Sequence, residues 1–349
     1  MVVGVRQVAG AAALLPAQGH AVDGLAGLGL TALAVPEARG GLGFGAIEAM
    51  VVMEELGRGL VLAPYAAAAL VAPTLLAAAP EAVQAAWLPK IASGEARVVL
   101  AQQERSSRYR LDKVSTTATP VGDGWQLSGT KSLVPVGDLA DAFIVSARNG
   151  DTLGLWLVER SAAGVTTRGY LTQDGGRAAE VQLDAAAATL ITDTNALAVL
   201  EQAADVGTAA LCAEAVGAMD FLVKLTADYM NTRKQFGVAI SSFQALRHRM
   251  ADMKMQLELA RSMSYYASLK LNAPAPERRA AMARAKYQLG TSMRFISQQA
   301  VQLHGGIGVT DEYIVSHYFR KLTELEMSFG DTLHHLGEVS ARMQDTAGV

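Results

Sequence analysis

The stretch RKQFGVAISSFQ, Arg233 to Gln244, interrupts what otherwise reads as a long run of helix. Arg233 and Lys234 followed by Gly237 fit a plain helix C-terminus, with cations in the last turn and a glycine in the left-handed conformation. A guanidinium at such a corner also suits a diphosphate, because it can contact two oxygens at once. The stretch therefore predicts either a helix end or part of an anion site.

A second interruption, QLHGGIGVTDEY, begins at Gln302, about 70 residues further on. Gly305 and Gly306 leave the backbone amides bare, which suits a flat or anionic ligand that lies against the chain. Taken alone, each of the two interruptions is a weak signal. Together, in this order and at this spacing, the two interruptions are a stronger signal than either alone.

The bulk composition excludes several classes of function. The net charge of −3 argues against a nucleic-acid partner, which usually requires a basic face. No window reaches about 18 consecutive apolar residues, so no membrane span is expected. The single cysteine, Cys212, rules out an internal disulfide framework and fits a reducing, cytosolic compartment. The opening residues 1–21 are interpreted as a helix start rather than a signal peptide.

The pattern along the 349 residues changes twice, which predicts an α+β chain of three domains. Residues 1–97 are rich in Ala and Leu with helical periodicity, and a turn at Pro36 and a glycine-rich loop at 40–45 precede a helix. Residues 98–193 hold short alternating runs separated by turns such as Gly122–Gly124 and Asn149–Asp151, which predicts a small antiparallel β domain, either a barrel or a sandwich. Residues 194–349 predict a helical bundle. Its helices are expected at 195–232, 241–271, 276–304, after 311 and at 332–344, with Ser241 or Ser242 as an N-cap.

The two interruptions together, RKQFGxxIxxFQ and QLHGGIGxxxEYxxxxxxR, resemble the acyl-CoA dehydrogenase family. The upstream stretch LAVPEARGGLGFGAIEAMVVMEELGR resembles the first helical domain of that family. The resemblance covers nearly the whole chain and implies an N-terminal helical domain, a central β barrel and a C-terminal four-helix bundle. The resemblance also implies that the first helix or so of the family's N-terminal domain is missing.

The resemblance implies FAD bound across a subunit interface. One chain holds the flavin ring with its β domain, and the neighbour holds the ADP half with the two C-terminal motifs. Carried over to this sequence, the residues expected on the ADP side of a partner's FAD are Arg233, Gln235, Phe236, Gln244, Gln302, Gly305 and Gly306.

The residues expected to carry out the reaction are absent from this sequence. The family removes an α proton and a β hydride from an acyl thioester, and a glutamate takes the proton. That position corresponds here to Phe329, in MSFGDTLHH. Some members place the glutamate early in the first long bundle helix, which corresponds to Gly207, and the neighbouring family arginine is Thr208. Neither Phe329 nor Gly207 can accept a proton.

The β domain departs from the family in a parallel way. The run Thr-Glu-Pro…Gly-Ser-Asp is replaced by Gln103–Tyr109, in which only Glu104 survives by position. The Trp-Ile-Thr-Asn that lies against the flavin is replaced by Leu133–Val136, where Pro135 has no N–H and no hydroxyl remains. The ring half of the site is lost and the ADP half is kept.

This asymmetry indicates a chain that completes the FAD site of a partner. It resembles the small subunits of heteromeric members that act on pimeloyl-CoA-like or steroid side-chain thioesters. The implied partners are an acyl-CoA substrate, a paralogous subunit or a second copy in a dimer or tetramer, and an electron-transfer flavoprotein.

Two other interpretations stay open. In the first, the chain is a homo-oligomeric dehydrogenase with Asp331 or Glu104 as an unusual base, although Asp331 also suits an N-cap and Glu104 also suits pairing with Arg105 or Arg108. In the second, it is a flavin-free acyl-CoA-binding scaffold. No metal is expected, because the adjacent pair His334 and His335 point about 100° apart on a helix and no further ligand accompanies them.

Overall fold

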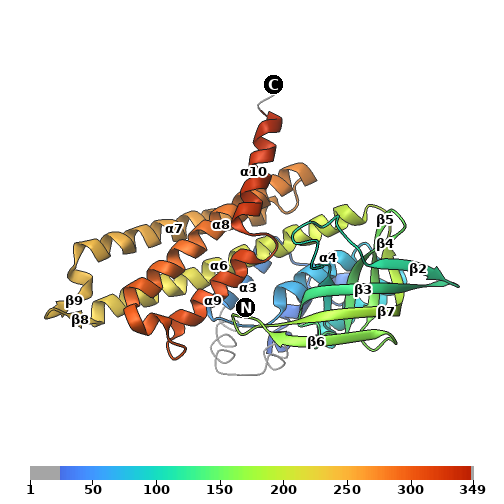
Figure 1. The fold of residues 1–349 in the computed structure, drawn as a ribbon, viewed down its shortest axis with the longest axis horizontal. Coiled ribbons are helices and arrows are strands. Elements are labelled where there is room, and N and C mark those ends of the chain that lie inside the picture. Colours follow the sequence, from blue (N-terminus) through green and yellow to red (C-terminus); the bar gives the residue numbers. More distant parts are fainter. Residues whose placement is uncertain (1–23, 347–349) are drawn as a thin grey trace. The chain divides into compact units, whose positions relative to one another are not determined.

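The computed structural model describes residues 24–346 (Figure 1). The helix start expected within residues 1–21 lies outside the described part. Packing divides the described chain into two compact units, one made of residues 50–61 and 208–346 and the other of residues 24–49 and 62–207. The domain boundaries at 97 and 193 do not coincide with this division and stay predictions.

The chain ahead of the β strands is helical, as expected. The turn at Pro36 is present, with the amide of Arg39 donating to the Pro36 carbonyl at 2.8 Å. In the glycine-rich loop, a Cβ on Gly41 would stand 1.9 Å from the Val35 carbonyl oxygen, so only glycine fits there. The helical elements are η1 (Leu30–Ala32), η2 (Glu37–Arg39), α3 (Ala46–Arg58), the π-helical turn η3 (Ala66–Val71), α4 (Ala72–Leu76) and α5 (Glu81–Ser93).

Seven strands form one sheet that closes on itself through the pairs β4–β2, β2–β3, β3–β7, β7–β5 and β5–β4. Their bounds are β1 (Val98–Ala101), β2 (Thr117–Val121), β3 (Gly124–Pro135), β4 (Ala142–Asn149), β5 (Thr152–Glu159), β6 (Val165–Leu171) and β7 (Arg177–Thr192). The expected turns are present: Gly122 and Gly150, with φ of 56° and 58°, each open a two-residue hairpin loop.

The expectation of a purely antiparallel barrel is wrong at β1, and also at the single bridge between Thr117 of β2 and Arg148 of β4, which is parallel. Strand β1 pairs parallel to β4, with Val98 opposite Ala142. The strand reaches β4 from the helical segment rather than through a hairpin, and only a tight hairpin obliges two strands to run antiparallel.

Strand β4 is buried on both faces and separates two apolar cores of the same unit. Phe143 and Val145 pack inside the barrel around Trp156. Ala142 and Ile144 face outward into a second core that includes helical residues such as Leu75, Leu76, Leu88 and Ile91. The barrel wall is therefore covered by helices on this side, as its unbroken apolar run AFIV requires.

The other unit is a helical bundle whose long helices agree with the sequence expectation to within three residues at each end. Its elements are α6 (Ala196–Thr232), α7 (Gln244–Lys270), α8 (Ala275–His304), η5 (Gly305–Val309), α9 (Ile314–Met327) and α10 (Thr332–Thr346). Figure 1 shows α7 lying along α8, and α10 leaving the bundle. The serine N-cap expected for α7 is wrong: Phe243 precedes the helix without a side-chain cap, and the Ser242 hydroxyl donates to the Ala239 carbonyl.

Helices α3 and α6 touch through their backbones. A Cβ on Gly57 would lie 1.9 Å from the Glu214 carbonyl oxygen, and one on Gly217 would lie 1.7 Å from the Glu54 carbonyl oxygen. The two glycines are thus reciprocal, each accommodating the backbone of the other helix. Arg58 of α3 and Arg261 of α7 then both pair with Asp220 of α6, so charges hold the crossing at its rim.

Within residues 24–346, α6 is the one helix that is long and apolar enough to cross a membrane. Its most apolar window is 78% buried inside the protein itself. That burial is what the central helix of a bundle requires.

Candidate functional site

The segment after α6 is a two-residue β hairpin. Strands β8 (Lys234–Gln235) and β9 (Val238–Ala239) pair around Phe236 and Gly237, whose φ angles are 56° and 83°. Two positive φ values in a two-residue loop are typical of a type I′ turn. Gly237 is left-handed, but it belongs to this turn and not to a helix end, so the helix C-terminus interpretation of the motif is wrong.

Phe236 is the most exposed large apolar side chain of the described residues, at 90% of its full accessibility. Among the aromatic rings of the described residues, its ring meets only the edge of Phe243, with ring centroids 6.0 Å apart. An aromatic residue with positive φ is strained, and an exposed ring gains little from its own chain. The hairpin therefore holds Phe236 outward in a strained backbone conformation, and the fold of the chain does little to offset that strain.

The three glycines of the second motif have three different reasons to be glycine. Gly305 ends α8 with φ 64° and ψ −142°, which an L side chain rarely adopts. A Cβ on Gly308 would meet the Val301 carbonyl oxygen at 2.8 Å, so internal packing excludes a side chain. A Cβ on Gly306 would meet nothing within 4 Å. Its bare backbone faces open space, where another molecule can approach.

An aromatic cluster brings the two motifs together at one end of the bundle. Tyr229, in the last turn of α6, stacks on His304 at the end of α8, with ring centroids 4.3 Å apart, and donates to the His304 carbonyl oxygen at 3.3 Å. Tyr313 packs against the same histidine at 5.3 Å. Arg233 is held next to this cluster, because its backbone amide donates to the Tyr229 carbonyl at 2.8 Å. Sequence reasoning missed Tyr229, because no spacing rule marks it.

All seven residues expected on the ADP side are exposed. Among the described residues, no hydrogen bond or ion pair holds the Arg233 guanidinium, so its N–H groups are available to an anion. The side-chain amides of Gln235, Gln244 and Gln302 can add donors around it. Cationic and amide donors beside a bare backbone at Gly306 fit a dinucleotide diphosphate.

The ring half does not fit a flavin in the same way. Leu133, at φ 53°, is half exposed. The amide of Val136 donates to the Arg177 carbonyl at 2.9 Å, and Pro135 has no N–H to offer. The nearby Ser132 hydroxyl is already bonded to Glu180 at 2.9 Å. The amide of Val136 and the hydroxyl of Ser132 are thus engaged within their own domain.

Glu104 is buried and fully engaged. Its carboxylate accepts from the amides and hydroxyls of both Ser115 and Thr116, and from the Lys131 ammonium at 2.8 Å. Burial by itself raises the pKa of Glu104, but these hydrogen bonds outweigh burial and bring the pKa to about 2. A carboxylate so stabilised is a poor proton acceptor. The ion pair with Lys131 replaces the expected pairing with Arg105, which lies 3.8 Å from Glu180.

The two positions to which the resemblance assigns the base are held by Phe329 and Gly207, whose side chains accept no proton. Phe329, at φ 54°, is partly exposed in the corner between α9 and α10. Gly207 is buried within α6. Asp331 accepts from the amide of His334 at 2.8 Å, which makes it the N-cap of α10.

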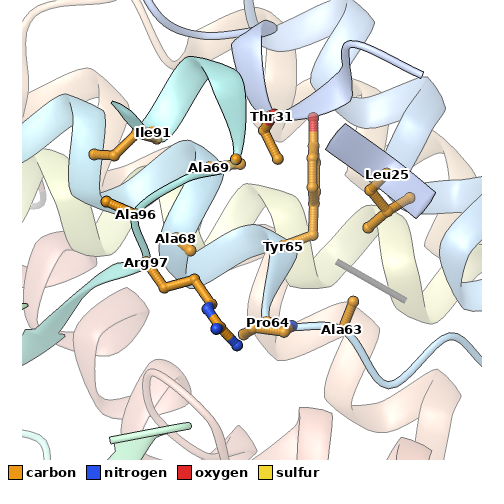
Figure 2. A pocket seen from close by; sticks show the side chains of 11 residues that line it. Leu25, Thr31, Ala63, Pro64, Tyr65, Ala68, Ala69, Ile91, Ala96 and Arg97 are labelled. Carbon is orange, nitrogen blue, oxygen red and sulfur yellow. The ribbon is translucent and has the colours of Figure 1, made fainter. Parts of the chain in front are cut away.

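A hollow of about 360 Å³, part of it open to solvent, lies in the helical segment beside the barrel (Figure 2). Its polar groups are largely satisfied: the Tyr65 hydroxyl donates to the Leu30 carbonyl at 2.9 Å and the Thr31 hydroxyl to the Ala92 carbonyl at 2.8 Å. None of the expected site residues lines it. Its walls are Leu25, Thr31, Ala63, Pro64, Tyr65, Ala68, Ala69, Ile91, Gly94, Ala96 and Arg97.

Comparison with known proteins agrees with the fold and with the motifs. Three family models match in order: the N-terminal domain of acyl-CoA dehydrogenases over residues 6–95, the middle domain over 100–186 and the C-terminal domain over 197–344. Acyl-CoA dehydrogenase IpdE2 of Mycobacterium tuberculosis is 32% identical over 84% of this chain and 77% of its own length. Acyl-CoA dehydrogenase FadE27 of the same organism is 26% identical over 91% of this chain and 86% of its own.

Two solved structures are similar over nearly the whole chain. One is described as the Tcur3481-Tcur3483 steroid ACAD G363A variant; its TM-score is 0.89 at 28% identity, over 100% of this chain and 98% of that one. The other is the ChsE4-ChsE5 complex of Mycobacterium tuberculosis, with a TM-score of 0.86 at 25% identity, over 97% and 95%. The chain belongs to the acyl-CoA dehydrogenase family of FAD-dependent flavoproteins.

Proposed function

We propose that this chain is a subunit of a heteromeric acyl-CoA dehydrogenase, in which it supplies the ADP side of a FAD whose ring is held by a paralogous partner. The residues proposed to hold the ADP half are Arg233, Gln235, Phe236, Gln244, Gln302, Gly305 and Gly306. The catalytic carboxylate of the complex then belongs to the partner.

One contrast carries the proposal. The bundle end keeps exposed donors and also Gly306, whose lack of a side chain is explained by no contact with the described residues. The segment at Leu133 and Pro135 lacks the hydroxyl donor that the family places against the flavin ring, and Phe329 stands where the family has its base. One half of a dinucleotide site with no matching other half supports a pocket that is completed by another chain.

In the complex, FAD would supply the hydride acceptor for α,β-dehydrogenation of an acyl-CoA thioester. This chain would bind and orient its ADP half: Arg233 would neutralise diphosphate charge, and the Gly305 and Gly306 backbone would let the nucleotide approach closely. The solved relatives include a steroid dehydrogenase, so acyl-CoA thioesters with bulky apolar groups are the first substrates to test. An electron-transfer flavoprotein as acceptor and a cytosolic location remain part of the proposal.

The flavin content of the purified chain tests the proposal. Produced alone, the chain should be colourless. Produced together with a paralogous acyl-CoA dehydrogenase chain encoded nearby, it should purify as a yellow complex with one FAD per two chains. The visible spectrum and the protein concentration together give this ratio.

Each rival function predicts a different spectrum. One FAD per chain in the isolated protein, bleached by an acyl-CoA, would establish the homo-oligomeric enzyme, with Asp331 as the remaining candidate base. A colourless protein that gains no flavin with any paralogue, yet binds acyl-CoA, would establish the scaffold. Either result would refute the proposed subunit role.

A further inference from the structure

A buried lysine holds the corner between α9 and α10. Lys286 of α8 is 1% exposed, and its ammonium donates to three backbone carbonyls: Leu325 at 2.8 Å, Glu326 at 2.9 Å and Gly330 at 3.1 Å. The first two lie in the last turn of α9, whose carbonyls have no partner within the helix. The third lies beyond the corner. One cation thus ties both sides of the turn to the neighbouring helix.

Two further side chains fix the same corner. The carboxylate of Glu326 accepts from the amide of Thr332 at 2.9 Å and from its hydroxyl, which joins the end of α9 to the start of α10. The imidazole of His335 donates to the Phe329 carbonyl at 3.1 Å. A Cβ on Gly330, which has φ 110°, would come within 2.7 Å of that imidazole. The backbone on both sides of residue 329 is therefore held by bonds that do not involve its side chain.

We propose that Lys286 is a positioning residue, which through its three carbonyl contacts fixes the direction in which the side chain of residue 329 leaves the bundle. The inference rests on the proposed function in one respect, because the resemblance makes position 329 the place of the base. A buried ammonium is costly unless every N–H group is used, and here all three are used on this corner. The backbone of the corner between α9 and α10 is thus fixed in advance, and the side chain that it positions in this chain is a phenyl ring.

A nitroxide label at position 329 tests the positioning directly. The only cysteine, Cys212, is buried, and burial raises its pKa to about 12, so a thiol-specific label reacts with an introduced cysteine alone. Phe329→Cys should give a single, motionally restricted spectrum by electron paramagnetic resonance. Adding Lys286→Met should produce a mobile component. Adding Lys270→Met, which removes a surface lysine paired with Glu277, should leave the spectrum unchanged.

A second label separates positioning from general loss of stability. Met255→Cys places it on the exposed face of α7. The proposal requires the label at 329 to loosen in Lys286→Met while the label at 255 keeps its spectrum. Equal loosening at both sites, or no change at 329, would overturn it. Lys286→Gln, which keeps two N–H donors, should give an intermediate mobile fraction at 329.

If the Lys286 variants do not fold, the label at residue 329 can be examined in a protein that keeps Lys286, with pH as the variable. Burial lowers the pKa of Lys286 to about 8, and a neutral amine has two N–H groups for three carbonyls. The groups that face it are Glu324, Glu326, Asp331, Cys212 and His335. Burial lowers the pKa of His335 to about 3, so neither it nor Cys212 changes charge between pH 7 and 9.5. The label at 329 should loosen over that range, and a constant spectrum would count against the proposal. The spectrum is recorded without FAD, so the positioning role of Lys286 and the proposed subunit role can each be refuted without the other.

Discussion

At the scale of single residues, identical amino acids serve different ends in this chain. Gly305 is required by its own backbone angles and Gly308 by the Val301 carbonyl, whereas no contact within residues 24–346 requires Gly306. The buried lysines also differ, because Lys131 faces a carboxylate and Lys286 faces three carbonyls. The neighbour in space, rather than the residue type, sets each role.

The paired substitutions Gly306→Ala and Gly308→Ala should separate binding from folding. Gly306→Ala should change the free energy of unfolding by less than about 0.5 kcal/mol, as expected for a surface site, and should weaken FAD retention in the complex. Gly308→Ala should destabilise the chain by about 1–3 kcal/mol through overpacking against the Val301 carbonyl. Urea unfolding and FAD release measure the two effects. A destabilised Gly306→Ala would show that its own chain requires that glycine.

Glu104→Gln should destabilise the barrel by about 3 kcal/mol at pH 7, because it leaves the Lys131 ammonium buried without its counter-charge. The folded pKa of about 2 lies below the ordinary value of 4.5. The carboxylate therefore stabilises the fold above about pH 4.5, and this contribution is lost as the pH falls toward 2. Urea unfolding at several pH values should show the difference between wild type and variant shrinking over that window.

The double variant Glu104→Gln with Lys131→Met provides the control. If the two groups act as a pair, it should cost less than the sum of the single changes. Strict additivity would mean that the ion pair is not what stabilises the region.

At the scale of elements, the sequence predicted the long helices well, because an apolar stripe repeated over eight or more turns outweighs local preferences. What it did not predict comes from contacts between elements. The crossing of α3 and α6 depends on two glycines that weaken each helix in isolation and would be scored there as breakers. The hairpin at 234–239 was not predicted for a related reason: its first turn residue is a phenylalanine rather than the usual asparagine or glycine.

Gly217→Ala should force α3 and α6 apart, since its Cβ would lie 1.7 Å from the Glu54 carbonyl oxygen. We expect a loss of about 3 kcal/mol, at the upper end for overpacked cores, because rigid backbone is displaced. Chemical unfolding followed by circular dichroism measures it. Gly337→Ala in α10, where nothing lies within 4 Å, is the matched control and should be neutral or stabilising by up to about 1 kcal/mol. Equal effects of the two changes would argue against a backbone contact.

At the scale of the whole molecule, each compact unit has its own apolar core, yet the exposed motif residues serve neither core. The ADP-side residues do little for the stability of their bundle, and Phe236 even strains it. In the proposed complex, contacts with a bound dinucleotide and a second chain would offset that strain. The functional unit of this protein is therefore expected to be larger than one polypeptide.

Arg233→Ala should lower the affinity of the complex for FAD by roughly 10- to 100-fold, which corresponds to about 1.5–3 kcal/mol for a charge-assisted hydrogen bond. The unfolding midpoint of the isolated chain should not move, because no described residue holds that guanidinium. Lys254→Ala, which removes a surface cation paired with Glu258, should leave FAD affinity unchanged. Fluorescence of released flavin gives the dissociation constant, and equal losses in both variants would point to a general charge effect.

By itself, the sequence determined the helix, barrel and bundle order and the long helices, and it predicted the two motifs proposed for the ADP half, because these depend on periodicity and on short spacings along the chain. Only the tertiary structure decided the parallel pairing of β1, the meeting of the motifs through Tyr229 and His304, the engagement of Glu104 with Lys131, and the corner held by Lys286. Each of these joins residues that are distant in the chain. Such contacts are selected by packing and by the need to satisfy buried charges, and no local pattern in the sequence records them.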